Sequence, residues 1–240
     1  MGNVYIVYRK LNMKIVVLLP MKANSERVSG KNFKNFCGKP LFQWILETLE
    51  SVKEIDEIVI NTDASEILID NGLVTNNRII LRDRRQDLCG DYVSMNDVLF
   101  DDVNNVDADI YLMTHTTNPL LSKESIREAL SIFKNALSRN SADSLFSVNK
   151  VQDRFYDRNS MPINHDPNNL IRTQDLEPWY VENSNLYLFT KESFLRNKTR
   201  IGNNPIMYET PPRESTDIDT IQDWDLAEAL VSYYESLEGE

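Results

Sequence analysis

A chain of 240 residues, 41% hydrophobic and 26% charged, can bury the core of one large domain and has the composition of an ordinary globular protein. Its formal net charge of −11 disfavours nucleic acid or an anionic membrane surface as a partner, because both are themselves negative. Two cysteines and two histidines are too few for a disulfide framework, a thiolate cage or a histidine-rich zinc site.

No apolar run in the sequence approaches the roughly 20 residues that a membrane-spanning helix requires. The short apolar stretch at residues 4–8 is followed by two basic residues and by no signal-peptide cleavage pattern, so we expect a cytoplasmic protein without a membrane partner. Because Met13 leads directly into the first strong strand, residues 1–12 are interpreted as an N-terminal extension or alternative start. Residues 13–240 are then expected to form a single domain.

Short apolar runs alternate along the chain with helical patterns. Buried strands are predicted over residues 15–19, 58–60, 79–81, 110–113, 145–148, 185–189 and 206–209. Helices are predicted over residues 40–51, where Pro40 suits a first turn, over 122–139, and from Asp223 onward. Strands separated by helices are joined by right-handed crossovers. The sequence therefore predicts an α/β, Rossmann-like fold with a mainly parallel sheet flanked by helices.

Residues 149–182 break this rhythm. The segment is polar, contains several prolines, and carries aromatic residues that include Trp179 and Tyr180. A structureless loop of this length is unusual within a compact domain. We therefore expect it to form a small lobe, or an arm that reaches a partner.

Segments rich in polar and charged residues follow four of the predicted strands. They are residues 20–32 after the first strand, 61–63 after the second, Arg82 after the third and 114–120 after the fourth. In an open parallel sheet, ligands bind beyond the carboxyl ends of the strands. The sequence therefore predicts that these segments converge on one crevice.

The loop after the first strand carries three cations and several small polar side chains: Lys22, Asn24, Ser25, Arg27, Lys31 and Asn32. This mixture suits a polyphosphate, which needs both positive charge and many hydrogen-bond donors. The loop lacks the Lys-Ser/Thr ending of a Walker loop and the glycines of a dinucleotide fingerprint. A solvated surface loop would have a similar composition, so the charge pattern alone leaves that alternative open.

Two aspartates, Asp217 and Asp219, lie close to the predicted last helix. In an extended segment their spacing places both carboxylates on one face while Ile218 turns inward. One or two carboxylates together with phosphate oxygens are a common binding site for Mg²⁺. The alternative is structural, because Asp219 or Thr220 could cap the last helix with Asp223 completing the cap.

Short motifs follow one another in a characteristic order along the chain: Lys22-Ala23-Asn24-Ser25, Lys31-Asn32, Gly38-Lys39-Pro40-Leu41, Asn61-Thr62-Asp63, Arg82, Thr117-Asn118-Pro119-Leu120, Arg172-Thr173-Gln174-Asp175-Leu176-Glu177-Pro178, Glu182-Asn183 and Asp217-Ile218-Asp219-Thr220. Their order and spacing resemble those of the acylneuraminate cytidylyltransferase family, the CMP-sialic acid synthetases and related CMP-sugar synthetases. In this comparison Arg82 stands for the arginine that opens the family's Arg-Pro-x-x-Leu stretch. The resemblance covers nearly the whole chain, from Met13 to Leu230.

The resemblance implies a nucleotidyltransferase that joins CTP and an acidic sugar, a sialic acid relative or another ulosonic acid, into a CMP-sugar and pyrophosphate, with Mg²⁺ as cofactor. It implies catalytic roles for Lys22, Lys31 and Asp219, and Mg²⁺ ligation by Asp217 and Asp219. The nucleotide-binding residues that it implies are Lys22, Ser25, Lys31, Asn32 and Arg82. The sugar-binding residues that it implies are His115, Thr117, Arg172, Gln174 and Asn183.

Two of these implications concern the predicted arm. Arg172 is the candidate for binding the sugar's carboxylate, because a guanidinium fork matches that geometry. In the family the arm crosses to a second subunit, so the resemblance implies a homodimer. Trp179 and Tyr180 could stack on a sugar, or could pack within the arm or the dimer interface.

The chain departs from the family pattern at several positions. Lys22 stands where the family has Arg, Leu121 replaces an Arg, and Ser184 takes the place of the glycine in Glu-Asn-Gly. His115 and Thr116 replace Gln-Pro, and His115 could serve as a general base or as a hydrogen-bonding substitute for Gln. The changes at His115 and Ser184 fall where sugar contacts are expected, so the identity of the sugar stays open.

Three alternatives to a CMP-sugar synthetase are considered. One is another nucleotide-sugar enzyme, either a pyrophosphorylase that uses a sugar 1-phosphate or a glycosyltransferase. A second is a cytidylyltransferase for an acidic acceptor that is not a sugar. A third is a non-catalytic nucleotide-binding relative, which the substitutions at Lys22 and His115 would suit but which the retained Lys31, Asp217 and Asp219 disfavour.

Overall fold

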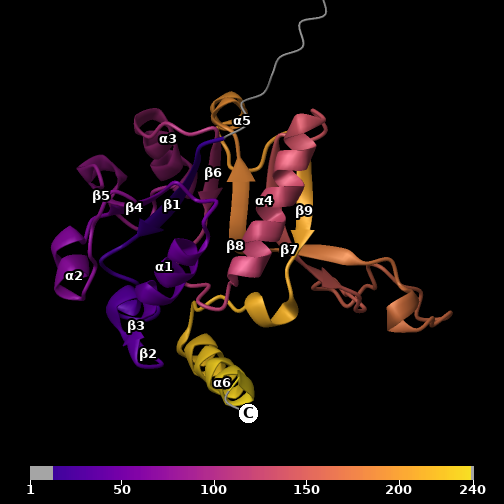
Figure 1. Ribbon diagram of the computed structural model, residues 1–240. Coiled ribbons are helices and arrows are strands. Elements are labelled where there is room, and N and C mark those ends of the chain that lie inside the picture. Colours follow the sequence, from indigo (N-terminus) through magenta and orange to yellow (C-terminus); the bar gives the residue numbers. More distant parts are fainter. Residues whose placement is uncertain (1–12, 239–240) are drawn as a thin grey trace, which may run out of the picture.

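The computed structural model describes residues 13–238, so the expected N-terminal extension lies outside the described residues. A seven-stranded sheet runs through the molecule in the order β5-β4-β1-β6-β8-β7-β9 (Figure 1). Its strands are β1 (Ile15–Met21), β4 (Glu57–Thr62), β5 (Ile79–Asp83), β6 (Ile110–Met113), β7 (Ser144–Val151), β8 (Trp179–Phe189) and β9 (Pro205–Glu209). β8 pairs antiparallel with β6 and β7, whereas the other neighbours in this sheet are parallel. The predicted mainly parallel α/β sheet is confirmed.

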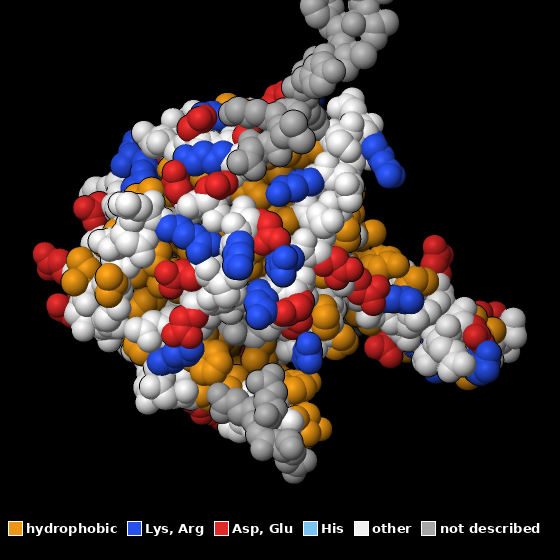
Figure 2. All heavy atoms as spheres, viewed as in Figure 1, with side chains coloured by type: hydrophobic (Ala, Val, Ile, Leu, Met, Phe, Trp, Pro, Cys, Tyr) orange, Lys and Arg blue, Asp and Glu red, His pale blue; other side chains and the backbone are white. Residues whose placement is uncertain are grey.

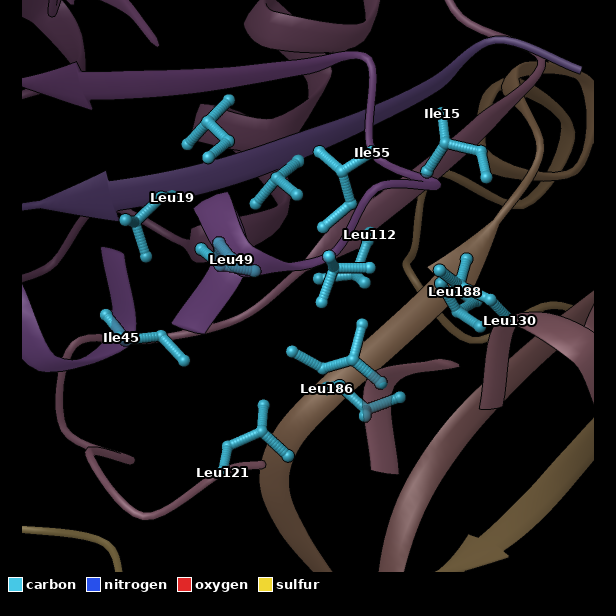
Figure 3. Close-up of a cluster of buried hydrophobic side chains, with 14 of the residues drawn as sticks. Ile15, Leu19, Ile45, Leu49, Ile55, Leu112, Leu121, Leu130, Leu186 and Leu188 are labelled. Carbon is cyan, nitrogen blue, oxygen red and sulfur yellow. The ribbon is translucent and has the colours of Figure 1, made fainter. Parts of the chain in front are cut away.

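Helices cover both faces of the sheet, which is why β1 is buried along its whole length. One core contains alternate residues of β1, such as Ile15 and Leu19, together with side chains of α1 (Leu41–Ser51), α2 (Ser65–Asp70) and α4 (Lys123–Ser138) (Figure 3). The intervening residues Val16 and Leu18 enter a second core with α3 (Met95–Asn105) and α5 (Lys191–Asn197). The alternation of side chains along a strand thus builds a three-layer domain around β1.

The predicted strands are all present, and the predicted helices 40–51 and 122–139 correspond to α1 and α4. Pro40 belongs to a small hairpin of β2 (Asn35–Phe36) and β3 (Lys39–Pro40), so α1 begins one residue later, at Leu41. The last helix, α6 (Ile221–Glu238), begins two residues before the expected position. The helices α2, α3 and α5 were not predicted. They are short or polar, and α3 contributes few residues to the core beyond Val98, Leu99 and Val103.

Residues 149–182 form an arm that projects from the body of the domain (Figure 1). β7 and β8 continue past the rest of the sheet as a two-stranded ribbon, in which Val151 pairs with Trp179, and residues 152–178 connect the two strands beyond it. The Phe155 ring stacks on Trp179 with ring centroids 5.0 Å apart. The arm nevertheless exposes many apolar side chains: Tyr156, Met161, Ile163, Leu170, Ile171, Trp179, Tyr180 and Val181. The segment therefore projects as an arm, and its contact with a partner stays a prediction.

A backbone irregularity in β8 lies where the arm joins the sheet. The register shifts between the pairs Phe146–Tyr187 and Val148–Glu182, so β8 carries additional residues opposite Ser147. Ser184 adopts a φ of 58° in this bulge, a left-handed conformation that favours glycine. This conformation explains in physical terms why a glycine would suit the position that Ser184 occupies.

Replacing Ser184 by glycine is therefore expected to stabilise the protein. Ser184→Gly relieves the left-handed strain and should raise the free energy of unfolding by about 0.5–1 kcal/mol, after allowance for the greater freedom of glycine in the unfolded chain. Chemical denaturation measures this difference. Ser184→Ala is the matched control, because it keeps the strain and should give no gain. A Ser184→Gly protein that is less stable than the wild type would contradict the argument.

Candidate active site

A cavity of about 300 Å³ opens at the carboxyl ends of β1 and β6. Its lining comes from the loop after β1, the end of β6 and the segment before α6. It brings together many of the residues that the sequence predicted for the site: Lys22, Ser25, Lys31, Asn32, His115, Thr117 and Asp219. Figure 2 shows basic side chains gathered beside acidic ones near the middle of the face that is viewed there. The predicted convergence of separate chain segments on one crevice is confirmed for these residues.

Lys31 connects the two ends of the chain at this cavity. Gly30 has a φ of 60°, and this turn leads into a 3-10 helix, Lys31–Phe33, that directs Lys31 into the protein. The side chain is 9% exposed, and its Nζ donates a hydrogen bond to the carbonyl oxygen of Ile218 at 2.5 Å. The same Nζ lies 3.4 Å from Oδ1 of Asp219. A lysine that is held in this way presents a fixed positive charge to the cavity.

The sequence left two roles open for the segment before α6, metal binding and capping of the helix. Ile218 is fully buried, whereas its neighbours Asp217 and Asp219 are partly exposed, but of the two aspartates only Asp219 is among the described residues that line the cavity. The start of the helix is capped by other groups, since the Asp223 carboxylate accepts from the backbone N–H of Thr220 at 2.7 Å and from its hydroxyl at 2.8 Å. The carboxylate of Asp219 is therefore available to the cavity.

Two further ion pairs lie at the cavity. Arg27 Nη1 is 3.1 Å from Oδ2 of Asp219, and Lys22 Nζ is 3.4 Å from Oδ1 of Asp91. Asp91 also lines the cavity, although no sequence pattern pointed to it. Because Arg27 is well exposed and Lys22 is partly exposed, these pairs are weak and can exchange their partners when an anionic ligand enters.

Neighbouring segments fix the path of the loop after β1. The backbone N–H of Ala23 donates to Oδ1 of Asp63 at 2.7 Å, at the end of β4. The Asn32 amide donates to the carbonyl oxygen of Lys22 at 2.9 Å and accepts from the Thr116 hydroxyl at 2.6 Å. Asn32 therefore holds Lys22 and the end of β6 at a fixed spacing. This positioning role was not anticipated from the sequence.

The structure places Arg82 differently from the expected nucleotide contact. Its guanidinium forms 2.6 Å ion pairs with Asp101 and Asp102 of α3, and it is not among the described residues that line the cavity. Arg84 instead ties the ends of two strands together, because it donates to the carbonyl oxygens of Met21 at 3.0 Å and Asn61 at 2.8 Å. The spacing of the Arg-Pro-x-x-Leu stretch could have found it, since it fits Arg84 and Leu88 and does not fit Arg82.

His115 lies at the end of β6 and lines the cavity beside Thr117. Burial, together with the charges of Arg200 and Lys31, lowers its pKa to about 4, although the charge of Asp219 acts in the opposite direction. The imidazole is therefore uncharged at neutral pH. A neutral ring with such a low pKa is a weak proton acceptor, which favours the hydrogen-bonding role over general base catalysis.

Three expected sugar-binding residues are not among the described residues that line this cavity. Arg172 and Gln174 belong to the arm, where Arg172 forms a bidentate pair with Asp175 at 2.7 and 2.9 Å. The Asn183 amide donates to Oδ1 of Asn149 at 2.8 Å and to the Thr210 hydroxyl at 2.7 Å, so it holds β7, β8 and the end of β9 together. Within one chain, the side chains of Arg172 and Asn183 therefore have structural partners.

Several proteins of known activity are similar to this chain over most of its length. The pseudaminic acid cytidylyltransferase of Campylobacter jejuni is 26% identical, with 91% of this chain and 96% of the relative covered. The CMP-N,N'-diacetyllegionaminic acid synthase of Legionella pneumophila is 28% identical, with 91% and 97% covered. The N-acylneuraminate cytidylyltransferase of Oncorhynchus mykiss is 27% identical, and the match spans 50% of that longer protein.

Solved structures share the fold at lower sequence identity. A CMP:2-keto-3-deoxy-manno-octonic acid synthetase in complex with CTP superposes with a TM-score of 0.64 at 16% identity, covering 92% of this chain and 99% of that one. The 4-diphosphocytidyl-2C-methyl-D-erythritol synthase of Anaerococcus prevotii gives a TM-score of 0.66 at 15% identity, covering 92% and 97%. The cytidylyltransferase family model matches residues 16–238. This chain belongs to the cytidylyltransferase family.

Proposed function

We propose that this protein transfers CMP from CTP to a hydroxyl group of an acidic sugar, a ulosonic acid of the sialic acid type, and releases pyrophosphate. The observation that carries the proposal is the cavity where Lys22, Lys31 and Asp219 meet in a member of the cytidylyltransferase family. Two relatives of similar length, a pseudaminic acid cytidylyltransferase and a CMP-N,N'-diacetyllegionaminic acid synthase, support an acceptor of this class.

The reaction is an in-line displacement at the α-phosphorus of CTP. The sugar hydroxyl forms a bond to phosphorus, loses its proton, and the bond to the pyrophosphate oxygen breaks. Such a reaction is accelerated chiefly by positioning and by neutralising the charge on the phosphates. Lys31 is fixed by its bond to Ile218 and supplies a preorganised charge, while Lys22 and the exposed Arg27 can follow the triphosphate as it binds.

Asp217 and Asp219 are suited to holding Mg²⁺. Oδ1 of Asp217 is buried, and none of the described residues gives it a hydrogen bond. Burial raises the pKa of Asp217, although the Thr117 side chain acts in the opposite direction. A buried carboxylate oxygen without a donor, two residues from a second carboxylate at the cavity, is a typical environment for a hard cation. When bound, Mg²⁺ would supply charge neutralisation for the phosphates.

Ser25, Asn32, His115 and Thr117 complete the proposed substrate site. Ser25 and Asn32 belong to the loop that carries the cations, so they are assigned to the nucleotide. His115 and Thr117 lie at the end of β6 and are assigned to the acceptor. Because His115 is neutral, it can donate one hydrogen bond and accept another, as an amide side chain does.

A homodimer is part of the same proposal. The arm exposes a group of apolar side chains, and a contiguous exposed apolar surface commonly marks a contact with another protein. A second subunit that packs against the arm would cover these residues, and Arg172 and Gln174 could then contribute to its substrate site.

Across residues 13–238 no helix is both long and apolar enough to span a membrane. We also propose a cytoplasmic location, where CTP is available.

An assay with defined substrates tests the proposed function. Purified protein is supplied with Mg²⁺, each of the four nucleoside triphosphates, and a panel of acidic sugars, and pyrophosphate release is measured. We expect release with CTP that depends on both the acid and the metal. Release with UTP and a sugar 1-phosphate would instead indicate a pyrophosphorylase. Nucleotide binding without release under any condition would favour a non-catalytic relative.

Asp219→Asn tests the assignment of the carboxylate at the cavity. Removing its charge should lower kcat by about a hundredfold or more, because the group contacts Lys31 and is a proposed metal ligand. Asp225→Asn, an exposed position on α6, is the matched control and should keep full activity. Circular dichroism should show that both variants are folded. Full activity in Asp219→Asn would show the assignment to be wrong.

Asp217→Asn tests the charge that is buried near the cavity. Because the folded-state pKa is raised, ionised Asp217 destabilises the fold at neutral pH, and this penalty disappears as the pH falls toward the ordinary value of 3.8. In the presence of EDTA, the substitution should raise the Tm by about 2–4 °C at pH 7 and by less near pH 4. The exposed Asp153→Asn control should show no such dependence.

Asp217→Asn also shows whether Asp217 is a metal ligand or only a buried charge that destabilises the fold. Mg²⁺ with CTP should raise the Tm of the wild type more than that of Asp217→Asn, because ligands stabilise the folded state that binds them. If Asp217→Asn lowers the Tm at pH 7, or if Mg²⁺ with CTP stabilises both proteins equally, the assignment of Asp217 as a metal ligand is contradicted.

A further inference from the structure

A second cavity, of about 330 Å³, adjoins the candidate active site. Its lining includes Ser94, Met95 and Asn96 from the start of α3, together with Glu182 of β8 and Arg200. Met95 lines both cavities, so the two meet at its side chain. A ligand that reaches from the first cavity into the second would pass Met95 and reach Arg200.

Arg200 is held in place but keeps hydrogen-bonding capacity. Its guanidinium carbon lies 3.8 Å from the centre of the Tyr187 ring, and the side chain is 20% exposed. Nη2 has one contact with Oε1 of Glu182, at 3.3 Å, and Nη1 faces the sulfur of Met113 at 3.9 Å. A guanidinium that pairs fully with a carboxylate uses two short bonds, as Arg172 does with Asp175. Arg200 can therefore donate hydrogen bonds to a further anionic partner.

The charge of Arg200 reaches the first cavity. The pKa of the His115 imidazole is lowered most by burial, next by the charge of Arg200, and then by the charge of Lys31. His115 lines the first cavity with Lys31, and the charge of Arg200 from the second cavity also acts on it. The part of the first cavity beside His115 is where an acceptor would lie if its hydroxyl is to attack the phosphorus of a nucleotide held by Lys31.

The chemistry of the acceptor gives this second cation a role. In a ulosonic acid, the carboxylate is attached to the anomeric carbon that also carries the attacking hydroxyl. The carboxylate must therefore lie close to the phosphate that is attacked, and it needs a cation that the triphosphate does not occupy. A planar guanidinium fork suits a carboxylate better than an ammonium group does.

On the basis of the proposed function, we propose that Arg200, at the junction of the two cavities, binds the carboxylate of the acidic acceptor and gives up its single contact with Glu182 to do so. Arg200 takes the role that sequence reasoning gave to Arg172, which lies on the arm and pairs with Asp175. The stacking on Tyr187 fixes the plane of the fork before the acceptor arrives.

Arg200→Met, Arg200→Lys and the control Arg196→Met, an exposed residue of α5, test this assignment in the full chain. The substrates are CTP with Mg²⁺ and N-acetylneuraminic, pseudaminic or N,N'-diacetyllegionaminic acid, whichever reacts fastest. We expect Arg200→Met to raise the KM for the acid by about tenfold to a hundredfold and to leave the KM for CTP within about twofold. The KM of Arg200→Lys for the acid should lie between those of the wild type and Arg200→Met, and the KM of Arg196→Met should match that of the wild type. An unchanged KM for the acid in a folded Arg200→Met protein would overturn the proposal.

A binding experiment separates this assignment from the proposed function. Saturation-transfer NMR compares each of the three acids with its methyl ester, in the presence of Mg²⁺ and a non-hydrolysable CTP analogue. We expect the wild type to prefer the acid, and Arg200→Met to lose that preference while it still binds the analogue. Acid-selective binding that depends on Arg200, without pyrophosphate release, would refute the function and leave the Arg200 assignment standing. Equal binding of acid and ester, or no binding of either, would overturn the assignment.

Discussion

The ammonium group of Lys31 joins the beginning of the fold to its end. Its bond to the Ile218 carbonyl and its contact with Asp219 bring the loop after β1 against the segment that leads into α6. A largely buried lysine needs such partners, because an unpaired charge in this environment would be costly. Lys31 therefore helps to hold the segment before the last helix against the cavity, together with the hydrogen bond from the Ile218 N–H to the Thr117 carbonyl oxygen.

The location of the site follows from how the sheet is covered. Both faces of β1 are packed against helices, so its backbone and side chains leave no room for a ligand along its length. Polar groups can gather only beyond its carboxyl end, where the strand order also brings in β4 and β6. The turn at Gly30 and the Asn32 amide then shape the loop that fills this space. The layered core thus determines where chemistry is possible.

The sequence predicted the parts of this structure that carry strong local signals. The continuous apolar run of β1 and the periodic stripe of α4 identified their elements, and the motifs identified Lys31 and Asp219. The ion pairs of Arg82 could not be predicted, because its partners Asp101 and Asp102 lie on α3, whose polar sequence gave no helical signal. Arg200 was missed for a related reason. The role proposed for it rests on its contact with Tyr187 and on the effect of its charge on His115, and these residues come together only when β6 and β8 pair.

Different side chains cap α6 and face the cavity, although they are neighbours in the sequence. Thr220 and Asp223 satisfy the start of the helix, while the carboxylate of Asp219 serves the cavity. Asp219 can therefore change without removing the cap of the helix, so a substitution there would alter the cavity while the fold is kept. The chemistry of the cavity and the integrity of the helix are in this way separable by mutation.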